Sequence, residues 1–184
     1  INKNRIGAYY ILRAMGAKIK FFNKRKYFNE EVADIFVRSS KLKGINVNNK
    51  KFIITALDDL PAVWLACSLA QGKSHFQGTS LSELQLKESK RISVMSENFK
   101  RFGIKTHTTK FSFTIQGKSK IKTNKLIKIP KVLDHRVLLC MHVLANITGC
   151  RVLINGFETV ATSFPSWLKL QKYKFGSKYE IIKN

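Results

Sequence analysis

The chain has 184 residues, and 44% of them are hydrophobic, which is enough to bury one good core or two small ones. Its 34 Lys and Arg residues against 11 Asp and Glu give a formal net charge of +23. The basic residues are spread along the whole length, so we interpret them as a solvated surface and keep a nucleic-acid-binding module as the less favoured alternative. No apolar stretch reaches the ~20 residues of a membrane span. No zinc-ligand set, GxGxxG or GxxxxGK[ST] loop occurs.

Two segments of the chain each consist of a helix, a glycine and then a strand. A helix is predicted over residues 5–15, and Gly16 releases the chain into a strand at 18–22. The same succession recurs over 91–105, where the helix ends at Gly103. The glycine after each helix favours the left-handed backbone that ends a helix.

A second pair of segments has the same succession of helix, glycine and strand. Residues 60–72 predict a helix followed by a strand at 73–77, and residues 136–149 predict a helix followed by a strand at 151–155. Repeats of this length are supersecondary units that need neighbours to bury their faces. We therefore predict an α/β domain of about two and a half such units. Alternation or β-branched content gives three further strand candidates, at 33–38, 51–55 and 111–116.

The first residues and the cysteines indicate which part of a protein this chain represents and in which cellular compartment it is found. Residue 1 is Ile rather than Met and stands almost inside the first helix, so we expect the downstream part of something longer. No signal peptide is recognisable. The three cysteines are odd in number and lack CxxC spacing, and Cys67 and Cys140 lie in apolar helical runs. We expect buried free thiols in a soluble, cytoplasmic protein.

The few acidic residues gather beside arginines at three places. These are the pair Asp58-Asp59, the segment 83–91 with sequence ELQLKESKR, and the triplet Asp134-His135-Arg136. A chain this basic has little general need for carboxylates. Acids set beside Arg suit a site that holds an anion and also moves protons.

Each of these places also has a plain structural interpretation. Asp58 or its neighbour can cap the helix that contains Pro61, and Asp134 can cap the helix that follows it. Glu88 and Arg91 stand three residues apart and can form an ordinary surface pair. For an isolated Asp before a helix, capping is the better interpretation.

Taken together, the segments resemble one family. The sequence at 83–91 resembles the E-L-R-V-K-E-S-D-R segment of EPSP synthases, and 58–61, with DDLP, resembles their D-E-x-P. Residues 134–136 resemble their D-H-R, and 161–165 resemble their A-T-S-F-P. The order and spacing of these motifs agree with those of the family along essentially the whole chain. Residues 4–7 and 41–45 have family counterparts as well.

The resemblance implies an enolpyruvyltransferase fold. Members of the family fold as two similar domains, each built from three βαβαββ units in an inside-out α/β barrel. Residues 1–184 resemble the C-terminal domain alone and are expected to form a single domain. The N-terminal domain, with its serine-rich contacts to shikimate 3-phosphate and a catalytic lysine, has no counterpart in this sequence.

The resemblance also implies chemistry. The family transfers the enolpyruvyl group of phosphoenolpyruvate to the 5-hydroxyl of shikimate 3-phosphate and releases phosphate, by addition and then elimination. Asp58 matches its catalytic aspartate and Glu88 its catalytic glutamate; which of them is the acid and which the base stays open. Because catalysis occurs between the two domains, we expect little activity from this half alone. A separately encoded N-terminal half is an expected partner.

Four further residues are assigned to substrate by the resemblance. Arg91 and Arg136 match arginines that hold phosphoenolpyruvate, where the planar guanidinium suits carboxylate and phosphate. Lys87 matches a contact to shikimate 3-phosphate, and His135 is expected to support the Arg136 site. No metal and no cofactor are expected.

Two departures keep a second hypothesis open. Gln85 stands where the family has arginine, and Lys90 replaces the aspartate that precedes Arg91. A lysine there puts a like charge beside Arg91 and is expected to weaken the anchoring of its side chain. Such departures from the family sequence are also expected in a non-enzymatic remnant.

A related enzyme acting on UDP-N-acetylglucosamine shares the fold, but residues 134–136 and 162–165 favour the shikimate enzyme.

Overall fold

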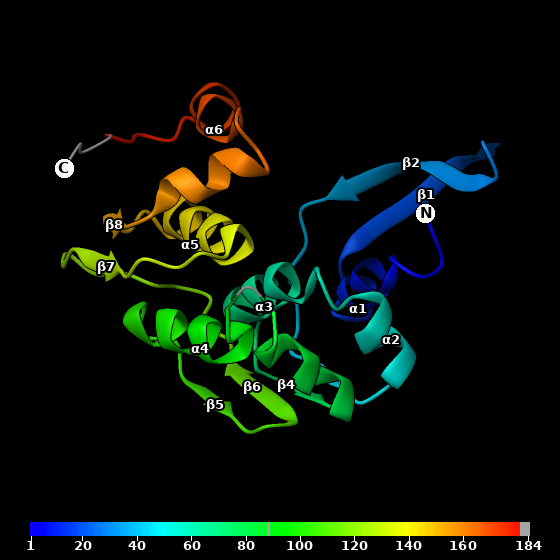
Figure 1. Cartoon of the computed structure of the whole chain (residues 1–184), viewed down its shortest axis with the longest axis horizontal. Coiled ribbons are helices and arrows are strands. Elements are labelled where there is room, and N and C mark those ends of the chain that lie inside the picture. Colours follow the sequence, from blue (N-terminus) through cyan, green and yellow to red (C-terminus); the bar gives the residue numbers. More distant parts are fainter. Residues whose placement is uncertain (88, 181–184) are drawn as a thin grey trace. The chain divides into compact units, whose positions relative to one another are not determined.

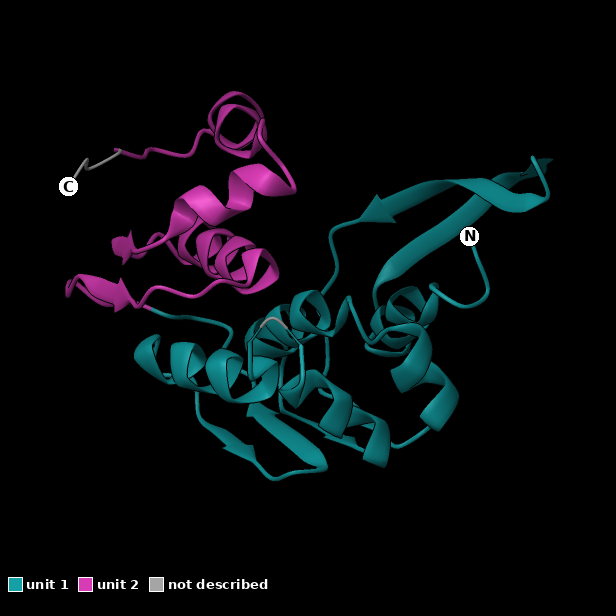
Figure 2. Cartoon of the chain, in the orientation of Figure 1, with its two compact units in different colours: residues 1–121 teal, residues 122–184 magenta. Residues whose placement is uncertain are grey.

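A computed structural model describes residues 1–87 and 89–180 of the chain (Figure 1). The chain packs as two compact units, which we call unit 1 (Ile1–Ile121) and unit 2 (Lys122–Asn184) (Figure 2). Helices and strands occur in both units. The predicted mixed α/β class is therefore confirmed.

Unit 1 begins with a helix and a long hairpin. Helix α1 (Gly7–Ala14) leads to strands β1 (Lys18–Tyr27) and β2 (Glu30–Arg38), which pair antiparallel from one end to the other. Gly16 follows α1 with φ +98°, so the left-handed backbone occurs where the sequence predicts the helix to stop. In Figure 1 the hairpin extends away from the helices of the same unit.

The main sheet of unit 1 has four strands in the order β3-β4-β6-β5. They are β3 (Asn46–Val47), β4 (Lys73–Gln77), β6 (Ser112–Gln116) and β5 (Thr106–Thr108). β3 runs parallel to β4, and β6 pairs antiparallel with both β4 and β5. β6 is thus an interior strand with a partner on each edge.

Helices α3 and α4 of unit 1 bury the hydrophobic core against this sheet. Trp64 is fully buried, with its ring centroid 4.7 Å from that of Phe113 and 6.2 Å from that of Phe76, both in edge-on contact. Aromatic pairs in this geometry add to the hydrophobic gain of burial. The helical segments are α2 (Lys50–Thr55), α3 (Leu60–Leu69), η1 (Thr79–Gln85) and α4 (Arg91–Arg101).

The prediction of a strand at 51–55 is wrong, because these residues form α2. The Asn49 side chain accepts hydrogen bonds from the backbone N–H groups of Lys51 and Phe52 and so caps the helix. The Phe52 ring stacks on Tyr10 of α1 at 5.9 Å. Capping and packing against α1 together outweigh the β-propensity of a run rich in β-branched residues.

Unit 2 repeats part of the succession of unit 1. Strands β7 (Ile127–Ile129) and β8 (Val152–Ile154) pair in parallel, and helix α5 (His135–Thr148) connects them. η2 (Phe157–Thr162) and α6 (Trp167–Phe175) follow. The order strand, helix, strand, 3-10 helix, helix also describes β3, α3, β4, η1 and α4, except that unit 1 has the additional helix α2 between β3 and α3.

The predicted helix–glycine–strand units are confirmed, with one difference. Gly103 and Gly149 follow α4 and α5 with φ of +74° and +68°. Helix α3, however, ends at Leu69, and Gly72 lies in the turn beyond it with φ +92°. The glycine there shapes the entry to β4 rather than the last turn of the helix.

All three cysteines are buried, as predicted. Burial raises the pKa of the Cys67 thiol to about 12, so this sulfur stays protonated at physiological pH. None of the helices within the described residues has both the length and the apolar character needed to cross a bilayer.

Unit 2 holds a buried histidine that should make its stability depend on pH. Trp167 of α6 donates through Nε1 to Nδ1 of His142 in α5 at 2.9 Å, so the imidazole is neutral there. Burial lowers the pKa of His142 in the folded chain. Its contribution is therefore present above about pH 6.5, the unfolded value, and is lost as pH falls through the folded pKa.

We expect urea unfolding, followed by tryptophan fluorescence, to show a lower free energy of unfolding at pH 5 than at pH 7.5. Breaking the bond to Trp167 alone should cost about 0.5–1.5 kcal/mol. His142→Gln should reduce this pH dependence, whereas His107→Gln, at an exposed position, should leave it unchanged. Equal pH dependence in wild type and His142→Gln would contradict the assignment.

Candidate active site

A carboxylate lies in the turn between α2 and α3. Asp58 follows the end of α2, and Asp59 occupies the N-cap position of α3, whose first turn contains Pro61. The two acids therefore have different places in the fold. Asp59 is exposed at the helix start, while the Asp58 side chain is only 22% exposed.

Three cationic side chains from distant parts of the sequence converge on Asp58. Arg5 donates from Nη1 to Oδ2 at 2.7 Å. Lys87 Nζ lies 3.5 Å from Oδ1, and Arg91 Nη1 lies 3.9 Å from the same oxygen. One carboxylate oxygen thus faces Arg5, and the other faces Lys87 and Arg91. We call Asp58 with these three residues the Asp58 cluster.

The fold brings the cluster together from three separate parts of the chain, near residues 5, 58 and 87–91. Arg5 comes from the turn before α1, Asp58 from the α2–α3 turn, and Arg91 from the first residue of α4. Lys87 lies between η1 and α4. The cluster is therefore a property of the packed unit 1 and not of any one segment.

Burial differs sharply among the three cations. The Arg91 side chain is fully buried, that of Lys87 is 35% exposed and that of Arg5 is 66% exposed. Water and salt screen the outer cations far more than the inner one. Among the described residues the cluster sets three cations against one carboxylate, and an anion can reach Lys87 and Arg5, its solvent-exposed members.

Of the site residues predicted in unit 1, the structure brings together Asp58, Lys87 and Arg91. Glu88, the second carboxylate predicted, lies outside the described residues. Lys90 is exposed, whereas Arg91 next to it is fully buried. Lys90 and Gln85 line a separate hollow of about 500 Å³, together with Ser93, Thr108, Thr109 and Lys110.

Arg5 is the cluster member that the sequence motifs did not assign to the site. It stands 53 positions from Asp58, and its only signal was the match of residues 4–7 to the family. A basic residue directly before a helix that packs beside α2 and α3 is the pattern that could have indicated it. Long-range ion pairs of this kind cannot be read from local spacing.

In unit 2 the predicted triplet lies at the start of α5. Asp134 is fully buried and accepts from the backbone N–H of Arg136 at 3.1 Å, so it caps the helix as expected. His135 and Arg136 are half-buried in the first turn. The cap fixes the direction of the helix start and hence of both side chains.

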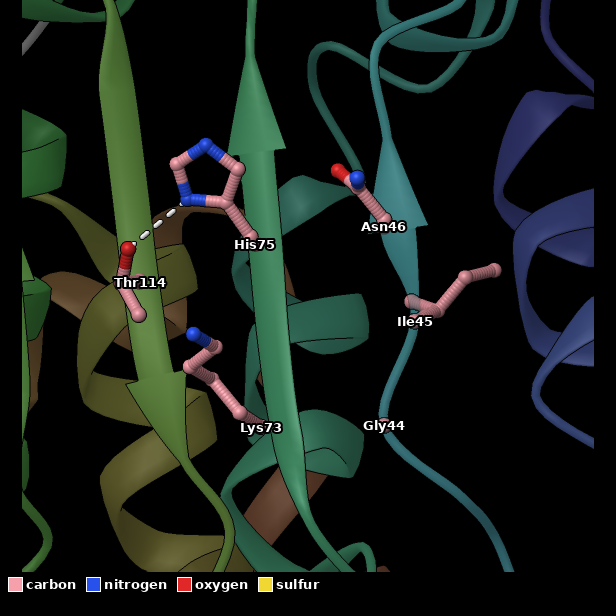
Figure 3. A pocket seen from close by; sticks show the side chains of 6 residues that line it. All are labelled: Gly44, Ile45, Asn46, Lys73, His75 and Thr114. Atoms are coloured by element: carbon pink, nitrogen blue, oxygen red, sulfur yellow. Dashed lines mark hydrogen bonds between the residues drawn. The ribbon is translucent and has the colours of Figure 1, made fainter.

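Unit 1 also has a shallow hollow on its main sheet, of about 400 Å³ (Figure 3). Figure 3 shows the His75 imidazole reaching across to Thr114 on the neighbouring strand, with Nδ1 2.8 Å from Oγ1. The lining contains no member of the Asp58 cluster. Among the described residues no three or more His, Cys, Asp or Glu side chains gather into a possible metal site.

A family model for EPSP synthase (3-phosphoshikimate 1-carboxyvinyltransferase) matches residues 1–170. The chain belongs to the EPSP synthase family. Among curated relatives, the 3-phosphoshikimate 1-carboxyvinyltransferase of Zymomonas mobilis is 34% identical over 98% of this chain, and that of Campylobacter jejuni subsp. doylei is 36% identical over 92%. The chain spans only 40% and 37% of the lengths of these two relatives.

Solved structures agree with the family assignment. An EPSP synthase from Acinetobacter baumannii superposes with a TM-score of 0.78 at 34% identity, covering 94% of this chain and 39% of that one. The enolpyruvyl transferase NikO from Streptomyces tendae matches at a TM-score of 0.62 with 12% identity, and this likeness shows the fold alone.

Proposed function

We propose that residues 1–184 are the C-terminal half of an EPSP synthase. Completed by an N-terminal half, this half would transfer the enolpyruvyl group of phosphoenolpyruvate to the 5-hydroxyl of shikimate 3-phosphate. The observation that carries the proposal is the Asp58 cluster, in which the carboxylate and two of the predicted cations come together within 3.9 Å. Aromatic biosynthesis in the cytoplasm is the setting that this activity implies.

The cluster suits the chemistry in two ways. Its positive charge favours dianionic substrates, and Arg91, although its side chain is fully buried in this structure, adds a guanidinium whose planar shape suits a carboxylate or phosphate. Asp58 supplies a group that can accept or return a proton beside the bound anion. By family resemblance Lys87 is assigned to shikimate 3-phosphate, and Arg91 and Arg136 are assigned to phosphoenolpyruvate.

The second carboxylate and the histidine complete the proposal. Glu88 is assigned to proton transfer together with Asp58, because addition and elimination need a proton delivered to carbon and another removed from the hydroxyl. His135 is assigned a supporting place next to Arg136 at the start of α5. The reaction uses no metal and no cofactor in this proposal.

The proposal explains why this chain alone should be nearly inactive. Positioning two substrates against each other can contribute ~7–11 kcal/mol of the barrier, and the resemblance places further binding groups on the other domain. We expect phosphate release from phosphoenolpyruvate plus shikimate 3-phosphate to be at background with the chain alone. Mixing it with the upstream part of the Acinetobacter baumannii enzyme should restore release.

Two variants make the test decisive. Glu88→Ala should abolish the restored activity, because it removes an assigned proton-transfer group. Glu97→Ala, which is on α4 but outside the site, should leave it unchanged. Failure of the mixture to turn over, with the chain shown to be folded and the two parts shown to associate, would favour a remnant that keeps the motifs without the activity.

A further inference from the structure

A hollow of about 500 Å³ opens in unit 1 between helix α4 and the end of strand β5. Gln85 at the end of η1, Lys90 just before α4 and Ser93 in the first turn of α4 line one side of it. Residues 108–110, at the end of β5 and the start of the turn to β6, line the other side. We call it the α4–β5 hollow. Its lining contains no member of the Asp58 cluster.

The spacing of residues on the helix and the strand explains where the hollow opens. α4 packs against β5, and the hydroxyl oxygens of Ser96 and Thr106 lie 2.8 Å apart in a hydrogen bond. Ser93 lies one turn back on the same face of the helix, and Thr108 lies two residues on along the same face of the strand. Among the described residues, the hydroxyls of Ser93 and Thr108 have no hydrogen-bond partner. The contact that closes the space at Ser96 is therefore absent one turn away.

The rim of the α4–β5 hollow is cationic. Lys90 and Lys110 are both exposed, and neither forms an ion pair within the described part of the chain. The Lys110 ammonium lies 5.3 Å from the centre of the Phe111 ring, an aromatic contact that favours one placement of this side chain. Among the described residues, no Asp or Glu lines the hollow. Two ammonium groups beside free hydroxyl donors attract an anion.

The two departures from the family motif at 83–91 both line this hollow. Gln85 stands where the family has arginine, and Lys90 stands where it has aspartate. Arginine and aspartate at these positions have opposite charges that cancel. Glutamine and lysine leave one positive charge and remove the carboxylate. The departures therefore change the charge of the hollow in the direction that favours an anion.

The polar groups of the lining suit a phosphate group. A phosphate monoester has about −1.5 to −2 charges at neutral pH and three oxygens that accept hydrogen bonds. Serine and threonine hydroxyls and the Gln85 amide can donate to these oxygens, and lysine pairs with the charge. A volume of about 500 Å³ lies within the range of roughly 300–1,000 Å³ that is usual for small-molecule sites. The hollow therefore has room for an organic group attached to the phosphate.

We propose that the α4–β5 hollow binds the phosphate group of a small phosphorylated molecule, at a site separate from the Asp58 cluster. Ser93 and Thr108 donate from their hydroxyls, and Lys90 and Lys110 pair with the charge of the phosphate. The site goes beyond the proposed function, because none of these four groups takes part in the proposed reaction.

The experiment titrates glycerol 3-phosphate into the full chain and follows the amide signals residue by residue by NMR. Saturable shifts are expected at Ser93, Thr108 and Lys110. Inorganic phosphate should move the same amides, because the phosphate group makes the contacts, and glycerol should move none of them. No saturable shift with either phosphate compound would overturn the proposal. Binding of inorganic phosphate alone would overturn the assignment to a phosphorylated molecule.

Substitutions in the lining test the two kinds of contact. Lys90→Asp should weaken binding at least roughly 10-fold, because an attraction becomes a repulsion. Gln85→Arg combined with Lys90→Asp restores both family residues and should give the same loss in a chain whose relatives fold with these side chains. Thr108→Val keeps the shape of the side chain and removes one donor, which should weaken binding roughly 2–10-fold. Unchanged affinity in these variants would overturn the proposal.

Lys105→Asp is the matched control for charge. Lys105 is exposed, lies between α4 and β5 and does not line the hollow. The charge change equals that of Lys90→Asp, but solvent screens it, so affinity should stay within about twofold of wild type. Equal losses in Lys90→Asp and Lys105→Asp would show a general attraction of anions to a basic chain and would overturn the proposal.

Lys87→Met separates the hollow from the Asp58 cluster. This variant removes one cation of the cluster and leaves the lining of the hollow unchanged. The shifts at Thr108 and Lys110 should persist with unchanged affinity, and their loss would show that the anion binds in the cluster instead. Because the measurement needs no turnover, the hollow can bind where the proposed reaction fails, and the reaction can occur where the hollow does not bind.

Discussion

Replacing Asp58 with Asn is expected to abolish turnover and at the same time to strengthen anion binding. The variant keeps the shape of the side chain but removes the only carboxylate between Arg5, Lys87 and Arg91 among the described contacts. Loss of a positioned acid or base lowers turnover by roughly 10²–10⁴-fold. Phosphate release by the chain assembled with an upstream half measures this loss.

The gain in anion affinity has an electrostatic cause. With Asn at position 58, the cluster changes from two excess positive charges to three, and a bound anion no longer meets a like charge a few ångströms away. At an effective dielectric constant of about 20, one such repulsion is worth up to ~4 kcal/mol before screening. We expect inorganic phosphate, titrated by NMR into the isolated chain, to bind about tenfold more tightly.

Asp59→Asn is the matched control. Asp59 is adjacent in sequence but exposed at the N-cap position of α3, where its side chain makes no capping hydrogen bond that Asn would have to replace. Turnover and phosphate affinity should both stay within about twofold of wild type by that reasoning. An Asp58→Asn variant that keeps full turnover would remove Asp58 from the proposed proton transfers.

The fold was predictable where local chemistry decides it. Glycine after an apolar helical run marked the ends of α1, α4 and α5, and the left-handed backbone occurs at those glycines. The strand wrongly expected at 51–55 failed because Asn49 caps a helix there and Phe52 stacks on α1. The division into two units at residue 121 had no local signal that we could recognise.

The candidate site was predictable only through motifs. The resemblance to the family made Asp58, Lys87 and Arg91 candidates, but nothing local says that residues 58 and 91 lie 3.9 Å apart. Arg5 escaped assignment because its partner is 53 positions away and a lone arginine before a helix has many ordinary roles. Tertiary packing of α1, α2 and α4 supplies this information.

The expectation that Lys90 weakens the anchoring of Arg91 rested on sequence adjacency alone. In the fold Lys90 is exposed, whereas Arg91 is fully buried beside Asp58. Solvent screens the exposed ammonium, and adjacent residues at a helix start point in different directions. The departure at position 90 is therefore a weak argument for a remnant.

Substitution of the three cations should weaken anion binding in the order of their burial. Arg91→Met should have the largest effect, because a fully buried guanidinium is unscreened and its loss leaves Asp58 with less compensation. Losing one partner of a buried charge pair costs roughly 2–5 kcal/mol. Lys87→Met should be intermediate. Arg5→Met, at a side chain that is 66% exposed, should cost about 1 kcal/mol or less.

The ranking separates a substrate site from a structural ion pair. A purely structural role predicts that Arg91→Met lowers the free energy of unfolding and leaves phosphate affinity unchanged in the folded fraction. A substrate site predicts that affinity falls in every folded variant, in the stated order, and that Arg91→Lys recovers only part of it because lysine lacks the planar fork. Arg101→Met, at the exposed end of the same helix, controls for the loss of one positive charge on α4. Equal affinities for Arg91→Met and Arg101→Met would show that the cluster does not bind the anion.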